Sequence, residues 1–98
     1  MTDAAPQASI PADATPRLPR GVRLTYNKAH GGWVLLAPER IFKADAIAVE
    51  ILKRCTGEAA FATIVDDLAA TFEAPRERIT TDVANLLRSL ADKRLLEL

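Results

Sequence analysis

The chain has 98 residues, 49% of them hydrophobic, which is enough for one small domain with an apolar core. Its 13 basic and 13 acidic side chains balance, so the sequence lacks the overall basic excess typical of nucleic-acid binding. One cysteine, Cys55, excludes an internal disulfide, and with a single histidine, His30, no cluster of metal ligands is expected. No apolar run reaches the length of about 18 residues that predicts a membrane-spanning helix. The N-terminus lacks the basic and apolar regions of a secretory signal, so a cytoplasmic location is expected.

Residues 1–19 form a segment rich in proline and alanine. Such a composition predicts a flexible arm, or a linker from which another domain has been separated. Ile10 and Leu18 are isolated apolar residues there, and we do not expect them to build a core. The ordered domain is expected to cover residues 20–98.

Alternating side chains predict a strand at the start of this domain, where Val22, Leu24 and Tyr26 are separated by polar residues. The turn-forming residues 27–32 follow, and the apolar run 33–36 predicts a second strand of a hairpin. Pro38 ends this strand because proline has no N–H for the ladder. Residues 40–44 are a third short extended segment.

Three helices are predicted next. Asp45 is a good N-cap for the first, which buries a face that includes Ala48, Ile51, Leu52 and Cys55, and Gly57 is placed to end it in the left-handed conformation. The second has the helical spacing of Phe61, Ile64, Val65, Leu68 and Phe72, and Pro75 is expected to open the third. The apolar stripe of the third comprises Ile79, Val83, Leu86, Leu87 and Leu90, and the tail residues Leu95, Leu96 and Leu98 are expected to dock on the body. The predicted fold class is therefore α+β, a winged helix-turn-helix-like domain with a three-stranded antiparallel sheet followed by three helices.

Catalytic constellations are missing from this pattern. Gly31 and Gly32 lie in a hairpin turn without the helix that a phosphate-binding loop needs. Asp66 and Asp67 are adjacent on a helix, so they cannot face one site together and are interpreted as a solvated face. We expect no catalytic residues, no metal ligands and no cofactor, so the chain is not predicted to be an enzyme.

The third strand suggests a binding function, since an edge strand carries unpaired N–H and C=O groups to which a peptide can add. Arg40 and Lys43 either protect this edge or guide such a peptide. The stripe of the third helix could supply pockets, although the residues alone favour core packing for it. Trp33 and Phe42 are likewise open between core and interface positions.

Several segments together resemble the PqqD family of pyrroloquinoline quinone biosynthesis. They are the run from Trp33 to Glu39 with Ile41 to Lys43, the helix from Ala48 to Cys55 with Gly57, the stretch from Ile64 to Leu68, and Asp82-Val83 with the leucines up to Leu96. The resemblance covers roughly residues 18–98. It implies a peptide chaperone, or RiPP recognition element, that binds the precursor peptide PqqA and presents it to the radical SAM enzyme PqqE. The iron–sulfur cluster and S-adenosylmethionine would then belong to the partner.

The resemblance also implies where the peptide binds: as an added strand beside the third strand, against the third helix. Carried over, the peptide-binding residues on the strand are Arg40, Ile41, Phe42, Lys43 and Ala44. Those on the helix are Val83, Leu86, Leu87, Arg88, Leu90 and Ala91, and Arg94 is a further charge partner.

The chain departs from the family pattern in two places. Thr56-Gly57 stands where many relatives have Asp-Gly, which alters a turn, and the N-terminal arm is longer than a compact member needs. Because some relatives are fused to another enzyme of the pathway, the arm could be an interdomain linker. The alternative function is a winged-helix DNA-binding module, and it is disfavoured because residues 76–94 carry five basic and three acidic side chains, a net charge of only +2.

Overall fold

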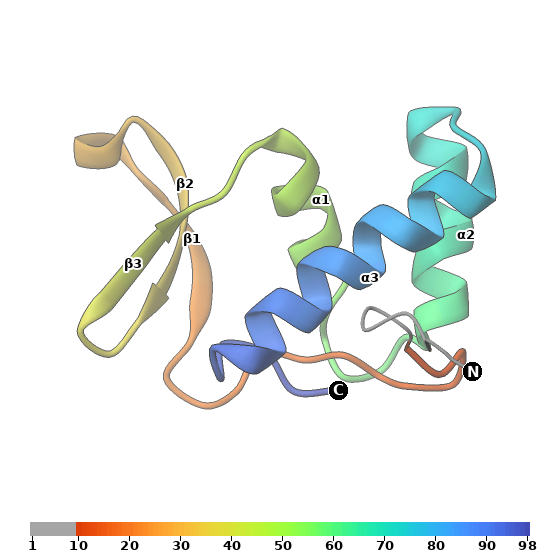
Figure 1. The fold of residues 1–98 in the computed structure, drawn as a ribbon. Helices are drawn as coiled ribbons and strands as arrows, with labels where there is room; N and C mark the ends of the chain where they lie inside the picture. Colours follow the sequence, from red (N-terminus) through yellow and green to blue (C-terminus); the bar gives the residue numbers. More distant parts are fainter. Residues whose placement is uncertain (1–9) are drawn as a thin grey trace.

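The computed structural model describes residues 10–98. Its strands are β1 (Arg23–Asn27), β2 (Gly32–Ala37) and β3 (Arg40–Lys43), with a single 3₁₀ turn, η1 (Lys28–His30), between β1 and β2. The helices α1 (Ala46–Lys53), α2 (Phe61–Phe72) and α3 (Arg76–Asp92) follow. Figure 1 shows the sheet at one end of the molecule, the helices at the other, and α3 crossing in front from α2 toward the sheet. The expected α+β fold class, with three strands followed by three helices, is therefore confirmed.

The sheet is antiparallel in the order β1-β2-β3, so β1 and β3 are both edge strands. Leu24, Leu35 and Phe42 lie opposite one another across it and pack against the helices. The adjacent row, formed by Arg23, Leu36 and Ile41, therefore points to the other side, because successive side chains alternate between faces. We call the two sides the inner and the outer face of the sheet.

Local signals in the sequence account for two of the helix starts, Asp45 before α1 and Pro75 before α3. The Asp45 side chain accepts a hydrogen bond from the Ala48 N–H at 2.8 Å, which confirms the predicted N-cap of α1. The prediction that Gly57 ends α1 is wrong, because the helix stops at Lys53 and Arg54 is its C-cap. Gly57 does have a positive φ of 86°, but it serves a later turn, in which its N–H donates to the Pro16 carbonyl at 2.9 Å.

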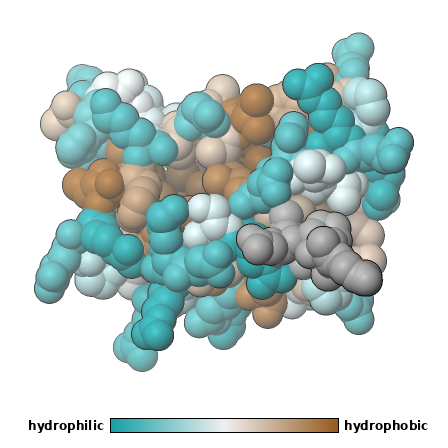
Figure 2. Space-filling model, viewed as in Figure 1, coloured by the Kyte–Doolittle hydropathy of each residue, from teal (hydrophilic) through white to brown (hydrophobic). Residues whose placement is uncertain are grey.

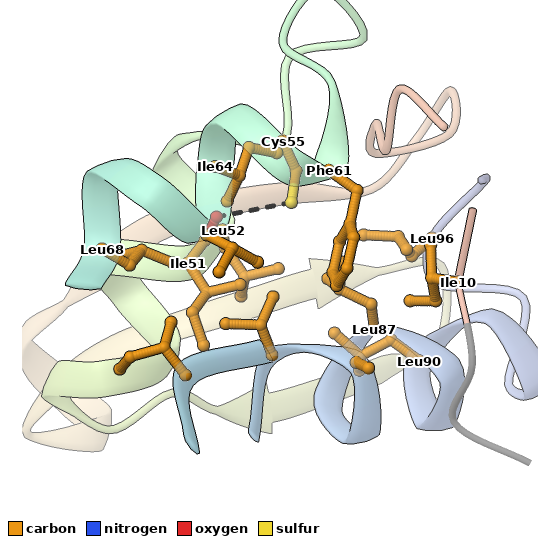
Figure 3. Packing of buried hydrophobic residues seen from close by; sticks show 14 of the residues in the cluster. Ile10, Ile51, Leu52, Cys55, Phe61, Ile64, Leu68, Leu87, Leu90 and Leu96 are labelled. Carbon is orange, nitrogen blue, oxygen red and sulfur yellow. Dashed lines mark hydrogen bonds between the residues drawn. The ribbon is translucent and has the colours of Figure 1, made fainter. Parts of the chain in front are cut away.

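The core lies between the inner face of the sheet and the three helices. Figure 3 shows side chains of α1 and α2 converging on Leu87 and Leu90 of α3, with Ile10 and Leu96 at the same end. Leu95 and Leu96 are buried as predicted, whereas Leu98 stays 41% exposed. Ile47 and Phe72 are also apolar helix residues that remain exposed, at 56% and 36%.

The N-terminal segment corrects one prediction. Ile10 is buried and Leu18 is half-buried, and both pack on the core from which we excluded them. Arg17 bridges to Thr56 and to Glu97, so this segment runs beside the C-terminal tail, as Figure 1 shows. Proline-rich composition suggested an arm, but backbone hydrogen bonds to distant segments hold residues 10–19 on the domain. Residues 1–9 of the predicted arm lie outside the described residues.

Candidate functional site

The free edge of β3 is the first part of the candidate site. The Ala44 N–H donates to the Trp33 carbonyl at 3.0 Å. Since bonded and non-bonded pairs alternate along an antiparallel ladder, Phe42 also bonds β2, through Leu35. The backbone N–H and C=O groups of Ile41 and Lys43 therefore point away from β2. Within residues 10–98 no strand pairs with this edge, so it can accept another strand.

Arg40 connects this edge to the end of α3. Its Nη2 donates to the Lys93 carbonyl at 2.9 Å, and its guanidinium lies 5.7 Å from the centroid of the Phe42 ring. Lys93 is the C-cap of α3, where the last carbonyls of the helix carry partial negative charge. Arg40 therefore brings the start of β3 and the end of α3 together, as the binding hypothesis requires.

The structure divides the predicted helix residues into core and surface. Val83, Leu87 and Leu90 are 1%, 0% and 7% exposed, so their side chains belong to the core, the interpretation favoured by the residues alone. Leu86 is half-buried and packs against the edge of that core, as Phe42 does from β3. Leu86 thus retains exposed apolar area that a ligand can contact.

Arg88 and Ala91 are half-buried on a different flank of α3. At 3.6 residues per turn, Arg88 lies about 160° and Ala91 about 140° around the axis from Leu86. Lys93, seven residues on, returns to within about 20° of Leu86 and is the residue that Arg40 contacts. Helical spacing therefore puts Arg88 and Ala91 on the opposite flank of α3 from Leu86 and Lys93. Arg94, the further charge partner, is exposed just beyond the helix end.

A small hollow between the three helices adjoins the same flank. Its volume is about 190 Å³, and it is open to solvent beside Ile47 and Phe72. Val83 lines its floor, and Arg78 and Asp82 stand on its rim. Ile47 lies in the first turn of α1 and is 56% exposed, an apolar surface position that helical spacing did not single out. We name Phe42, Ile47 and Leu86 the apolar strip.

Figure 2 shows hydrophobic side chains gathered in the middle of this face, with hydrophilic side chains around them. In the matching view of Figure 1, that region lies between the sheet, α1 and α3. An apolar centre with a polar rim is the usual anatomy of a binding surface. The position agrees with a ligand that lies along β3.

Several charged residues at the helical end of the molecule form ion pairs with one another. Asp66 and Asp67, predicted to be a solvated pair, are exposed and contact Arg76 and Arg54 respectively. Arg54 also contacts Glu50 at 3.0 Å, and its hydrogen bond lowers the pKa of that carboxyl. The hydrogen bond to Asp67 raises the pKa of Arg54 in turn. These contacts join the end of α1 and the start of α3 to α2.

Cys55 is the one thiol of the chain, and it is buried. Its Sγ lies 3.3 Å from the Ile51 carbonyl, and burial raises the pKa of the thiol to about 12. A nucleophilic cysteine needs a lowered pKa and access to substrate, and Cys55 has neither.

We expect Cys55 in the folded chain to react with Ellman's reagent at least ~100-fold more slowly at pH 8 than in guanidinium chloride, because only the unfolded thiol is accessible and ionises normally. The folded pKa exceeds the unfolded one, so this thiol also makes the free energy of unfolding fall as pH rises from 9 toward 12. Stopped-flow absorbance and pH-dependent denaturation measure these effects. Equal reaction rates in the two states would contradict the buried thiol.

In the part of the chain that the structure describes, no helix is both long and apolar enough to cross a bilayer. Residues 10–98 also contain no group of three or more histidine, cysteine or carboxylate side chains arranged to hold a metal ion.

The described residues thus form a small α+β domain of three antiparallel strands followed by three helices, with an unpaired edge at β3. The family model described as coenzyme PQQ synthesis protein D (PqqD) matches residues 32–96. The chain therefore belongs to the PqqD family, as the sequence resemblance predicted.

Relatives and solved structures agree with this assignment. A PqqA binding protein of Bradyrhizobium diazoefficiens is 47% identical over 85 residues, which cover 87% of this chain and 82% of the relative. One from Xanthomonas oryzae is 45% identical over 93% of this chain and 99% of its own length. The solution structure of the PqqD part of Methylobacterium extorquens PqqCD, described as a stand-alone RiPP recognition element, has a TM-score of 0.78 at 39% identity and covers 94% of this chain and 98% of its own. The crystal structure of PqqD from Xanthomonas campestris has a TM-score of 0.58 at 44% identity, with 92% and 100% covered.

Proposed function

We propose that this chain is a non-catalytic peptide chaperone of pyrroloquinoline quinone biosynthesis. It binds the precursor peptide PqqA as an additional strand along β3 and presents it to the radical SAM enzyme PqqE. The observation that carries the proposal is the unpaired edge at Ile41 and Lys43, on either side of Phe42 in β3. Main-chain hydrogen bonds at such an edge provide affinity, and alternate side chains of the peptide provide specificity.

The predicted site residues have different roles under this proposal. Residues 40–44 form the docking strand, Leu86 contacts the peptide from α3, and Val83, Leu87 and Leu90 hold the helix in position from the core. Arg88 and Ala91 would contact the peptide only if it wrapped around α3. Relatives that are named as PqqA binding proteins support the choice of peptide.

A two-dimensional NMR titration with synthetic PqqA peptide tests the proposal. We expect the largest shifts at the amides of Ile41, Lys43 and Leu86, because these residues border the added strand. Amides of Asp66 and Asp67 on the far helix serve as internal controls and should not move. The proposal fails if saturating peptide leaves residues 40–44 unperturbed.

DNA binding is the weaker candidate. At the start of α3, Arg76 and Arg78 face Asp66 and Asp82 at 2.5 and 3.8 Å, so both cations are partly neutralised. Phosphate contacts need several unneutralised cations on one surface. A salt-sensitive gel shift with sub-micromolar affinity for duplex DNA would favour this alternative.

A further inference from the structure

The net charge of the chain is zero, but basic and acidic side chains are unevenly distributed along the molecule. Residues 20–43, which include the sheet, contain five basic side chains and one acidic side chain, a net charge of +4. Residues 58–82, which include α2 and the first half of α3, contain two basic and six acidic side chains, a net charge of −4. Because the sheet and these helices lie at opposite ends of the molecule in Figure 1, one end is basic and the other is acidic.

The two ends also differ in how their basic side chains are paired. At the helical end, every basic side chain of α1, its C-cap and the first turn of α3 contacts a carboxylate: Lys53, Arg54, Arg76 and Arg78. At the sheet end, Arg20, Arg23, Lys28 and Lys43 form no ion pair with any described acidic side chain. The positive charge of the sheet end is therefore available to a partner.

Arg23 and Lys43 lie on the outer face of the sheet, together with Leu36 and Ile41. Ile41 is 47% exposed on this face, whereas Val34 of the middle strand, on the same face, is fully buried. A sheet face meant only for solvent is normally polar, whereas this one combines apolar side chains with cations. An open hollow of about 910 Å³ at the end of the sheet is lined by Arg23, Leu36 and Ile41 and by the turn from Ala37 to Arg40.

The composition of the outer face favours one kind of partner. Arginine beside apolar side chains is typical of protein interfaces. A nucleic acid would require more cations for the same area. The missing counter-charge must then come from carboxylates on the partner, which points to a folded protein with an acidic patch.

We propose that the outer face is a second docking surface, on which an acidic patch of the partner enzyme sits while β3 and the apolar strip hold the peptide. This inference rests on the proposed function, because presentation requires peptide and enzyme to bind at the same time and therefore at different surfaces. A strand added to β3 would use the free edge and leave the β1 side of the outer face open.

Arg23→Glu tests the second surface. Arg23 lies on β1, two strands from the free edge of β3, so the peptide should not contact it. At low salt we expect affinity for PqqE, measured by biolayer interferometry, to fall about 5- to 10-fold, mainly through slower association. The loss should shrink in 0.5 M salt, which screens exposed charges. Affinity for synthetic PqqA peptide, measured by fluorescence anisotropy, should stay within about twofold.

Arg78→Glu is the matched control, since it makes the same change of charge at a side chain that is 78% exposed at the acidic end. It should leave affinity for PqqE within about twofold. Equal effects of the two variants on a chain that still binds enzyme and peptide would overturn the second surface and spare the proposed function. If the unaltered chain does not bind PqqE at all, presentation and the second surface both fail. Binding of duplex DNA or of phosphatidylserine vesicles through Arg23, in place of PqqE, would also overturn the inference.

Discussion

Ile41→Pro should abolish most peptide binding while the domain stays folded. The Ile41 N–H points away from β2, so proline removes a donor that the sheet does not use internally, and edge strands tolerate proline. A peptide carbonyl left without its partner costs about 1–3 kcal/mol, which corresponds to roughly a 5- to 150-fold loss of affinity. Fluorescence anisotropy with labelled PqqA peptide measures the loss, and a dispersed NMR spectrum verifies folding.

Tyr26→Pro provides the matched control on the opposite edge. Tyr26 pairs with Trp33, whose backbone bonds β3, so the Tyr26 N–H points out from the free edge of β1. We expect this variant to bind peptide normally. The reverse result, with Tyr26→Pro impaired and Ile41→Pro unaffected, would move the docking strand to β1. Phe42→Pro is less informative, because the Phe42 N–H bonds β2 and its loss would damage the sheet itself.

Leu87→Ala should be the most destabilising single truncation of α3. Leu87 is 0% exposed and packs among all three helices, so removal of its side chain leaves a cavity at a cost of about 2–5 kcal/mol. A domain of this size has a total stability of only about 5–15 kcal/mol. The melting temperature should fall by roughly 10–30 °C, as measured by circular dichroism.

Truncation of the neighbouring residue, Leu86→Ala, should affect peptide affinity more than the stability of the fold. Leu86 is half-buried at the edge of the core, so its truncation should cost about 1 kcal/mol of stability and weaken peptide binding about 5- to 10-fold. Leu87→Ala, measured well below its melting temperature, should bind peptide within about threefold of the unaltered chain. If the two leucines exchanged these effects, the peptide would lie on a different flank of α3 from the one that faces β3.

The spacing of apolar residues along α3 does not predict which of them stays partly exposed. The spacing of Ile79, Val83, Leu86, Leu87 and Leu90 predicts a helix and an apolar stripe, and both are present. The stripe is wider than the surface that the core covers, so one of its members remains at the boundary. Which member it is depends on how α3 is rotated against α1 and β3, and local spacing carries no information about that rotation.

The N-terminal segment and Gly57 show the same limit. Ile10 is a single apolar residue among prolines, and its burial depends on contacts with segments more than 40 residues away. Gly57 has the expected positive φ, but it lies beyond the end of α1, in a turn whose Gly57 N–H donates to the Pro16 carbonyl. Long-range hydrogen bonds of this kind have no local sequence signature.

By itself, the sequence determined the order of the strands and helices, the Asp45 cap, most of the core and the membership of the PqqD family. These features depend on residue periodicity, on capping chemistry and on similarity spread along the chain, all of which are local or additive. The tertiary structure alone decided that Leu86 stays half-buried while Val83, Leu87 and Leu90 enter the core, and that Arg20, Arg23, Lys28 and Lys43, which form no ion pair with a described carboxylate, lie together at the sheet end. Such features arise when helices and strands pack at particular rotations, because only then do residues distant in sequence come to share a surface.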